Sequence, residues 1–478
     1  MTEEKNAAKP VFLKPLHPSI RRRSADPAEN PTLPLPTSSI AEAGWPKPFA
    51  GGIEYSPPAR GPWTIVHIGM LLPEMHEIFV CAQACLRGVV LSAAEMQVQD
   101  RFSTITVTEE HFRDGRLEET MIEGTTHILN SLEKRPKAVL LYTSCVHHFT
   151  GADVEWAMHV LKERFPDVVF IDAYMTPTFR KSEMPPDNKM RMQLYAGLER
   201  PAQPAGGLLL AGTLEPFGAA SYFAKIAARA GVPFYELAGL ERWDDYLALA
   251  NAALAVTINP AAKQAGDLLE ERLGLKRLSL SLSYDEAEID AENAKVAAAL
   301  GLDPNAAELL EAAEAAKRSA REALDAAREA LDGRAVAICQ SATTRPLGLA
   351  RRLLDAGICV TDIFADGFLT ADKPDYEALR RTHPALRIHP ITSPEMRFAP
   401  RDFPEGLVAV GQKAAWFTGA KHMVNLIEGG PLWGHEGVAE LARRIAQASK
   451  HETDVAAVIR IKGYGCLGGV CESEAAWI

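Results

Sequence analysis

Three of the seven cysteines in the sequence are placed where they could share a metal centre, namely Cys81, Cys85 and Cys145. Thiolates are the ligands that soft metals and iron–sulfur clusters prefer. Cys81 and Cys85 are one helical turn apart, so their sulfur atoms can converge on a single centre. Four histidines lie near these cysteines in the sequence: His67, His76, His147 and His148. The pattern therefore predicts a cluster site in this part of the chain.

Each of these thiols also has a plainer interpretation, because a free cysteine is among the most buried residue types. Zinc is another possibility, since three cysteines and one histidine form a known structural set. Zinc ligands usually come in closely spaced pairs, however, whereas Cys85 and Cys145 are separated by a whole predicted strand and helix. We expect Cys339 and Cys359, which lie at or within apolar runs, to be core residues.

The bulk composition is that of an ordinary globular protein. The chain has 478 residues, which is enough for about three domains, and 47% of them are hydrophobic. A net charge of -11 argues against nucleic acid or an anionic membrane as the main partner and favours another protein. Neither a transmembrane stretch nor a signal peptide is evident, so we predict a cytoplasmic protein.

The sequence pattern divides the chain into five predicted segments: 1–60, 61–205, 206–333, 334–450 and 451–478. The first is rich in proline and predicts an extended arm or a disordered segment. The three middle segments alternate apolar runs with amphipathic stretches, which is typical of doubly wound sheets. The predicted fold is therefore α/β, with three tandem Rossmann-like domains and an extended N-terminal arm. The last segment is a tail in which Cys466 and Cys471 form either another ligand pair or a reactive or structural pair.

In the first of these domains we expect a strand at 63–68, a helix at 81–96 and a buried strand at 138–142. Ligands of parallel sheets bind beyond the carboxyl ends of the strands, and Cys145 lies three residues past the last of these strands. Residues 305–332 predict a long amphipathic helix with a solvated, charged face. No G-x-G-x-x-G or Walker loop occurs, so we predict neither dinucleotide binding nor ATP hydrolysis.

Several segments resemble a known family. Residues 106–110 read Thr-Val-Thr-Glu-Glu and are followed by Asp114-Gly115, and residues 142–153 read Tyr-Thr-Ser-Cys-Val-His-His-Phe-Thr-Gly-Ala-Asp. Residues 429–437 read Gly-Gly-Pro-Leu-Trp-Gly-His-Glu-Gly. In order and spacing these motifs are similar to those of the nitrogenase component 1 superfamily, over residues of about 50 to 450.

The resemblance implies an α2β2 heterotetramer that receives electrons from an ATP-dependent iron–sulfur reductase. An [8Fe-7S] P-cluster-like or [4Fe-4S] cluster would lie at the interface with a homologous α-type subunit. The spacing of Cys85 and Cys145 is similar to that of the second and third cluster cysteines of the family. The first cluster cysteine is absent, and Glu54 or Tyr55 falls near its place. Because the family includes carboxylate ligands, Glu54 is a candidate, as is the additional thiol of Cys81.

The resemblance also implies a role for this chain within the complex. Catalytic subunits of the family hold a large cofactor with a cysteine and a histidine, but here the corresponding places read Thr-Ile-Asn-Pro at 257–260 and Met-Val-Asn-Leu at 423–426. The neighbouring His422 is expected to be structural. The chain therefore resembles a β-type subunit, with the substrate site in its partner.

Several functions remain open on this basis. Residues 70–90 are most similar to the methylthio-alkane reductases, which cleave carbon–sulfur bonds. A tetrapyrrole reductase subunit and a cofactor-assembly scaffold are alternatives within the family. Outside it, a metal-free nucleotide- or sugar-binding enzyme would use the cysteines only for packing.

Overall fold

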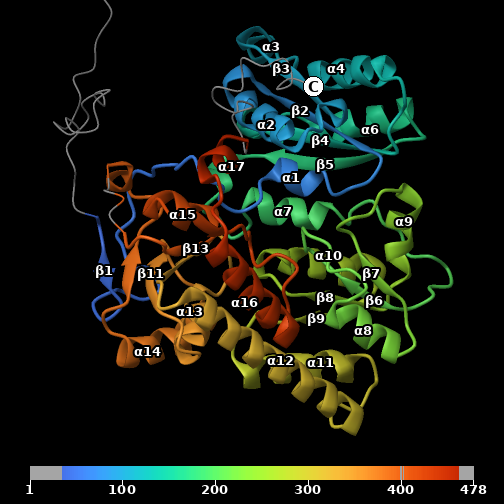
Figure 1. Ribbon diagram of the computed structural model, residues 1–478. Coiled ribbons are helices and arrows are strands. Elements are labelled where there is room, and N and C mark those ends of the chain that lie inside the picture. Colours follow the sequence, from blue (N-terminus) through green and yellow to red (C-terminus); the bar gives the residue numbers. More distant parts are fainter. Residues whose placement is uncertain (1–34, 399–400, 402, 462–478) are drawn as a thin grey trace, which may run out of the picture.

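The computed structural model describes residues 35–398, 401 and 403–461. The predicted tail cysteines, Cys466 and Cys471, and residues 1–34 of the predicted arm lie outside these ranges. The described chain forms three sheets flanked by helices, and all strands but the short β1 are parallel, which confirms the predicted α/β class (Figure 1). None of its helices is both long and apolar enough to cross a membrane.

The first sheet has the strand order β3-β2-β4-β5, and all its strands are parallel. Its strands are β2 (Met75–Ala82), β3 (Phe102–Val107), β4 (Ala138–Ser144) and β5 (Val169–Met175). Its helices are α1 (Ile65–Gly69), α2 (Gln83–Met96), α3 (Glu109–Arg113), α4 (Leu117–Ser131), α5 (Cys145–Thr150), α6 (Val154–Arg164) and α7 (Pro186–Gln193). Alternate residues of β4 pack against α1, α2 and α7 on one face and against α4 and α6 on the other. Both faces of β4 are therefore buried, which explains why its sequence is a continuous apolar run.

Two predictions in this sheet were wrong. Residues 63–68 were expected to be a strand, but α1 occupies this place, and the first strand of the sheet is β2. Helix α1 is buried almost all round, and a short apolar run does not show whether it is helix or strand. In β2 the buried polar residues His76 and Glu77 interrupt the apolar pattern. The prediction therefore missed this strand. Cys81 lies in β2, and α2 begins two residues later than predicted.

The second sheet repeats this topology with the order β7-β6-β8-β9. Its strands are β6 (Leu208–Leu210), β7 (Phe234–Glu236), β8 (Leu254–Thr257) and β9 (Lys276–Ser279). Its helices are α8 (Tyr222–Arg229), α9 (Trp243–Ala248), α10 (Lys263–Leu273), α11 (Glu286–Ala299) and α12 (Ala307–Leu331). Helix α12 confirms the long helix predicted at 305–332.

The third sheet has the order β1-β12-β11-β10-β13-β14, in which only β1 is antiparallel. Its strands are β1 (Ser38–Ser39), β10 (Val336–Cys339), β11 (Val360–Phe364), β12 (Arg387–His389), β13 (Val408–Val410) and β14 (His422–Val424). Its helices are α13 (Pro346–Asp355), α14 (Lys373–Thr382), α15 (Gln412–Thr418), α16 (Gly434–Lys450) and α17 (Val455–Ile461). Short 3-10 helices elsewhere are η2 (Gln99–Arg101), η3 (Pro177–Phe179), η4 (Leu249–Asn251), η5 (Pro260–Ala262), η6 (Thr370–Asp372) and η7 (Pro394–Arg397).

The described part of the predicted N-terminal arm lies on its own chain. Strand β1 pairs with β12 at the edge of the third sheet. Trp45 stacks on Phe368 with 6.1 Å between ring centroids and packs at 5.1 Å against Tyr376. This segment therefore covers an edge strand whose peptide groups would otherwise lack partners.

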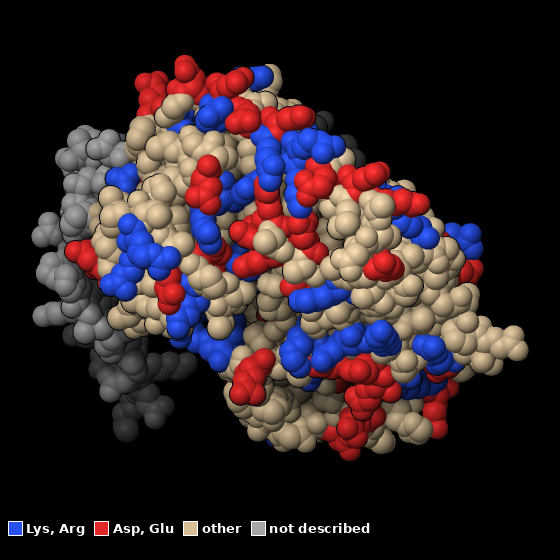
Figure 2. Space-filling model, turned by 90° about the horizontal axis from the view of Figure 1, so that it is seen from below, with Lys and Arg blue, Asp and Glu red and all other residues tan. Residues whose placement is uncertain are grey.

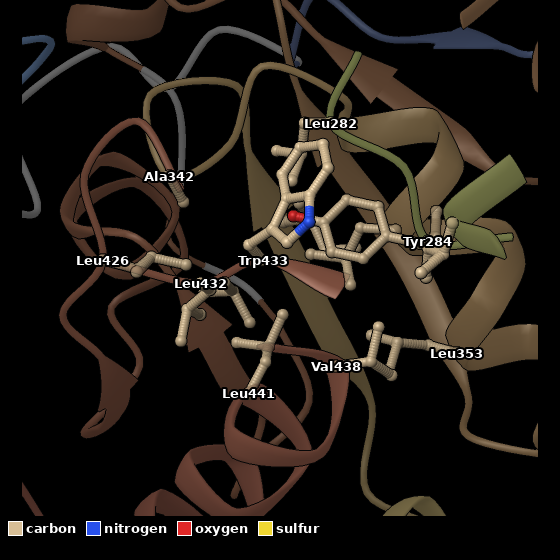
Figure 3. Close-up of a cluster of buried hydrophobic side chains, with 14 of the residues drawn as sticks. Leu282, Tyr284, Ala342, Leu353, Leu426, Leu432, Trp433, Val438 and Leu441 are labelled. Carbon is tan, nitrogen blue, oxygen red and sulfur yellow. The ribbon is translucent and has the colours of Figure 1, made fainter. Parts of the chain in front are cut away.

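A large apolar core joins the second and third sheets (Figure 3). Trp433 lies at its centre, between Leu282, Leu432 and Val438, and its indole Nε1 donates a hydrogen bond to Asn293 Oδ1 at 3.0 Å. Helix α16 packs here against the second half of α12. On the outer face seen in Figure 2, Lys and Arg side chains lie next to Asp and Glu side chains rather than in a patch of one sign.

All three sheets reverse their strand order at one point. These points lie between β2 and β4, between β6 and β8, and between β10 and β13. At such a point the connections leave in opposite directions and open a crevice at the carboxyl ends of the strands. These three crevices are where a parallel-sheet protein is expected to bind ligands.

Replacing Trp433 by alanine should lower the free energy of unfolding by about 3–5 kcal/mol, because it leaves a cavity in the core that joins two sheets. The matched control is Trp156→Ala, since Trp156 is exposed and its loss should change stability by less than about 0.5 kcal/mol. Urea unfolding followed by circular dichroism measures both. Equal midpoints for the two variants would contradict a joint core.

Candidate functional site

The three candidate cysteines all lie at the crevice of the first sheet. Cys81 is the penultimate residue of β2, Cys85 is in the first turn of α2, and Cys145 is the first residue of α5, directly after β4. The pairing of β2 with β4 ends at Phe79 and Tyr142, two residues before Cys81 and three before Cys145. The strands therefore separate at the level of the thiols.

Cys81 is placed as a core residue. Its side chain is 1% exposed, and its sulfur lies 3.8 Å from the sulfur of Met175 on β5. Burial, with a smaller contribution from the neighbouring Cys85 thiol, raises the pKa of Cys81 to about 12. A thiol that resists deprotonation is a poor metal ligand in this conformation, because the ligand is the thiolate.

Cys85 and Cys145 have the accessibility that a shared site requires. Cys85 is exposed, and Cys145 is half-buried with its sulfur 3.5 Å from Thr178 Oγ1. Within the described residues, no group of three or more His, Cys, Asp or Glu side chains is placed to hold a metal ion. The two accessible thiols could therefore supply only part of a ligand set.

Glu54 is held beside the same loop. Its carboxylate forms ion pairs with Arg180 and with Lys181, the latter at 2.8 Å. The hydrogen bond from Lys181 is the main cause of the lowered pKa of Glu54, and Arg180 adds to it. These cations follow Thr178 in the loop that contacts Cys145, so the structure brings Glu54 to the same side of the sheet. Binding a metal would require Glu54 to exchange these ion pairs.

The four nearby histidines have different surroundings. His67 is buried and contacts Arg60 and Thr64, with Nε2 2.8 Å from the Arg60 Nη1. His76 is buried beside Ser103, and burial lowers its pKa to about 4. His147 Nδ1 accepts a hydrogen bond from the Ser144 backbone N–H at 3.2 Å, which caps α5. His148 is exposed and packs edge-on against the ring of Phe179. Only His147 and His148 lie on the same helix as a candidate ligand.

Large apolar side chains are exposed in the segments that follow the strands of the first sheet and beside Glu54. They are Ile53, Val90, Phe112, Phe149, Phe179 and Met184. We call this set the apolar rim. Phe149 is 72% exposed, although a phenylalanine buried elsewhere would stabilise the fold by a few kcal/mol. An apolar surface of this kind usually marks a contact with another protein.

The crevice of the second sheet is filled by an ion pair. Arg191 from α7 donates to Glu428 Oε2 at 2.5 Å and to the backbone oxygen of Gly212 at 2.9 Å. Glu428, in the loop after β14, also accepts from Asn259 Nδ2 at 3.2 Å and from the Trp63 backbone N–H at 3.1 Å. Arg191 is 1% and Glu428 14% exposed at the side chain. The cavity that remains measures about 30 Å³, room for little more than one water molecule.

Comparison with known proteins agrees with this architecture. Residues 74–450 match the model of the family described as nitrogenase component 1 type oxidoreductase. The chain belongs to this family. The solved structure described as "Nitrogenase Cp1 at pH 6.5" is 12% identical with a TM-score of 0.62, covering 84% of this chain and 94% of that one. A second, "Nitrogenase Cp1 at pH 5", is 11% identical with a TM-score of 0.55, covering 84% and 90%. At such identities these structures show a shared fold only. No curated protein matches the sequence.

Within this component 1 type chain, the two segments that the resemblance associates with a catalytic cofactor do meet in space. Asn259 belongs to the first, and Glu428 lies two residues after the second. Sequence reasoning missed the Arg191–Glu428 pair, because 237 residues separate its members. Glu428 itself has a φ of 51°, a backbone conformation that is uncommon for residues other than glycine, but no local sequence pattern announces it.

In the cluster-free chain, Cys85 should react with iodoacetamide at least about tenfold faster than Cys81, because labelling Cys81 requires the sheet to open. Peptide mass spectrometry after brief labelling at neutral pH measures the two rates. Cys339 is buried as predicted and is the protected control. Cys359 was also predicted to be a core residue, but it is exposed and is the reactive control. Rapid labelling of Cys81 would show that its burial is wrong.

Replacing Glu428 by alanine should lower the free energy of unfolding by about 3–5 kcal/mol, because it leaves the buried Arg191 charge unpaired. The control is Glu452→Ala, which removes a pair with Lys421 between exposed side chains and should cost less than about 1 kcal/mol. Denaturant unfolding of both variants distinguishes them. If both variants unfolded like the parent chain, the centre would not depend on this pair.

Proposed function

We propose that this chain is the β-type subunit of a nitrogenase-like catalytic component. It relays electrons from an ATP-dependent iron–sulfur reductase, through a cluster at the subunit interface, to a substrate site in an α-type partner. The observation that carries the proposal is the position of Cys85 and Cys145, two accessible thiols at the crevice of a parallel sheet. Membership of an oxidoreductase family supports a redox role for them.

The donor set fits one half of a shared cluster. Cys85 lies in the first turn of α2, where the helix dipole favours the negative charge of a thiolate. Cys145 contacts the hydroxyl of Thr178, and the thiol of Cys85 is exposed to solvent in the single chain. When bound, an iron–sulfur cluster at this place supplies one-electron transfer. The partner subunit would complete the ligand set, and Glu54 or Cys81 would join it only after leaving their present contacts.

The apolar rim supports the presence of a partner at this edge. Phe149 and Phe179 follow two neighbouring strands of the first sheet, and both rings pack against His148, at 6.0 and 5.0 Å between centroids. Burying such side chains against another protein is favourable by about 25 cal/mol for each Å² removed from water. A partner bound here would also remove water from around the thiols, which strengthens electrostatic interactions with a cluster.

The filled centre supports the β-type assignment. A catalytic subunit needs room between its sheets for a large cofactor. Here the Arg191–Glu428 pair and Asn259 occupy that position, and only about 30 Å³ remains. The small size of this space supports a substrate site in the partner. Reductive cleavage of the carbon–sulfur bond in methylthio-alkanes is the reaction we propose, on the resemblance of residues 70–90 to the reductases of that class.

The decisive experiment is the iron and acid-labile sulfide content of the complex, purified without oxygen together with its partner. Cys85→Ser and Cys145→Ser should each reduce the iron content by at least about half, because serine replaces a thiolate ligand with a weakly binding hydroxyl. The matched control is Cys359→Ser, an exposed cysteine on the third unit, which should retain all the iron. An electron paramagnetic resonance spectrum identifies the type of cluster.

Three results would redirect the proposal. Iron-free protein with unchanged variants would leave the cysteines as packing residues of a metal-free enzyme. Full iron content without reduction of any methylthio-alkane, when the reductase and ATP are supplied, would favour a cofactor-assembly scaffold if the cluster then transferred to another protein. Reduction of a tetrapyrrole in the same assay would identify that branch of the family instead.

A further inference from the structure

A cavity of about 750 Å³ opens between helices α8, α11 and α12, at the start of α16. These helices lie at the opposite end of the molecule from the first sheet (Figure 1). The cavity walls are mostly apolar, with Ile226 from α8, Ala294 from α11, and Leu309 and Ala313 from α12. Its size falls in the range of pockets that hold small organic molecules.

Small side chains leave this space open. Alanines line both long walls: Ala291, Ala294 and Ala297 on α11, and Ala312, Ala313 and Ala316 on α12. The buried residues of α12 lie in its second half, in the core shared with α16, and none of the residues in its first three turns is fully buried. Leu310 in this part is half exposed. Apolar side chains of α11 and α12 therefore line the cavity from two sides.

Ion pairs set the distance between α11 and α12. Lys317 on α12 binds Asp290 on α11 at 2.6 Å and Glu314 on its own helix at 2.6 Å. Further along, Arg321 on α12 binds Glu286 on α11, which also binds Arg352 at 2.7 Å. These contacts hold the two helices at the length of their charged side chains. Closing the cavity would require these ion pairs to rearrange.

The polar groups around the cavity are already paired with one another. Asp290 binds both Lys317 and the buried His435, the latter at 2.8 Å, and Lys225 lies 3.8 Å from Glu436. The main chain and side chain of Asn293 accept hydrogen bonds from Tyr222 and Trp433. Three cationic and three anionic side chains line the cavity: Lys225, Arg229, Lys317, Asp290, Glu314 and Glu436. A charged ligand would find no uncompensated opposite charge here.

We infer that this cavity binds an uncharged, largely apolar small molecule, at a site separate from the proposed cluster. Apolar walls favour such a ligand, and the balanced ion pairs around them give an ionised one no advantage over water. The walls belong to four elements and include the buried His435, which suits a small molecule better than a second helix laid on a flat face. The inference does not depend on the proposed function, because its lining residues belong to the second and third units and include none of the proposed cluster ligands.

The test uses the full chain and two fluorescent probes of similar shape, uncharged N-phenyl-1-naphthylamine and anionic 1-anilinonaphthalene-8-sulfonate. The uncharged probe should bind saturably with one site per chain. Ala313→Trp, which fills the cavity, should weaken its binding by at least about tenfold. The matched control is Ala315→Trp, two residues away on the exposed side of α12, which should bind like the parent chain.

Ala294→Phe fills the cavity from the α11 wall and serves as a second blocking variant if Ala313→Trp fails to fold. Absence of saturable binding, or equal binding in the blocking and control variants, would overturn the inference. Tighter binding of the anionic probe would contradict the inference that the ligand is uncharged. If gel filtration showed a dimer that the blocking variants dissociate, the cavity would be a contact between copies of the chain and not a ligand site.

Discussion

The buried ion pair between Arg191 and Glu428 connects all three α/β units of this chain. Arg191 comes from α7, beside the first sheet, and it also binds the backbone of Gly212 after β6 in the second. Glu428 follows β14 in the third sheet and reaches back to Asn259 in the second. Taking two charges out of water is costly, so such a pair persists only where its geometry is satisfied on several sides. The units must therefore meet closely, and the space they enclose is too small for a cofactor.

Because the centre is closed, the accessible chemistry lies at the outer edge of the first sheet. In the first sheet and in the second, the carboxyl ends of the strands meet at a crevice where the strand order reverses. What differs is the content of the crevice: paired charges in the second sheet, and accessible thiols with exposed aromatic rings in the first. An incomplete ligand set beside an apolar surface is what one half of a shared site should look like. This difference between two similar crevices supports the proposed β-type role.

Local patterns predicted the elements that have a regular period and little else. Strand β4, the position of Cys145 just beyond it, and the long helix α12 could all be found from apolar periodicity. The prediction failed at 63–68 and at Cys81, because a short apolar run is ambiguous and polar residues are buried in β2. Contacts between distant segments left no trace in the sequence. The ion pairs of Glu54 with Arg180 and Lys181 and the pair at the centre are of this kind, and both alter what the candidate site can bind.

The long helix α12 shows why composition alone does not decide the role of a surface. Its many charged residues predict a solvated face, yet several of them form ion pairs that connect α12 to a neighbouring helix. The hydrogen bond from Arg321 contributes most to lowering the pKa of Glu286 to about 2. Arg352 donates a second hydrogen bond that lowers it further. Charged side chains are longer than alanine, so helices tied by ion pairs are kept farther apart than helices packed through alanine. Both kinds of contact occur along α12. In the second half of α12, alanines pack closely against α16, and beside its first half, ion pairs to α11 hold a cavity open.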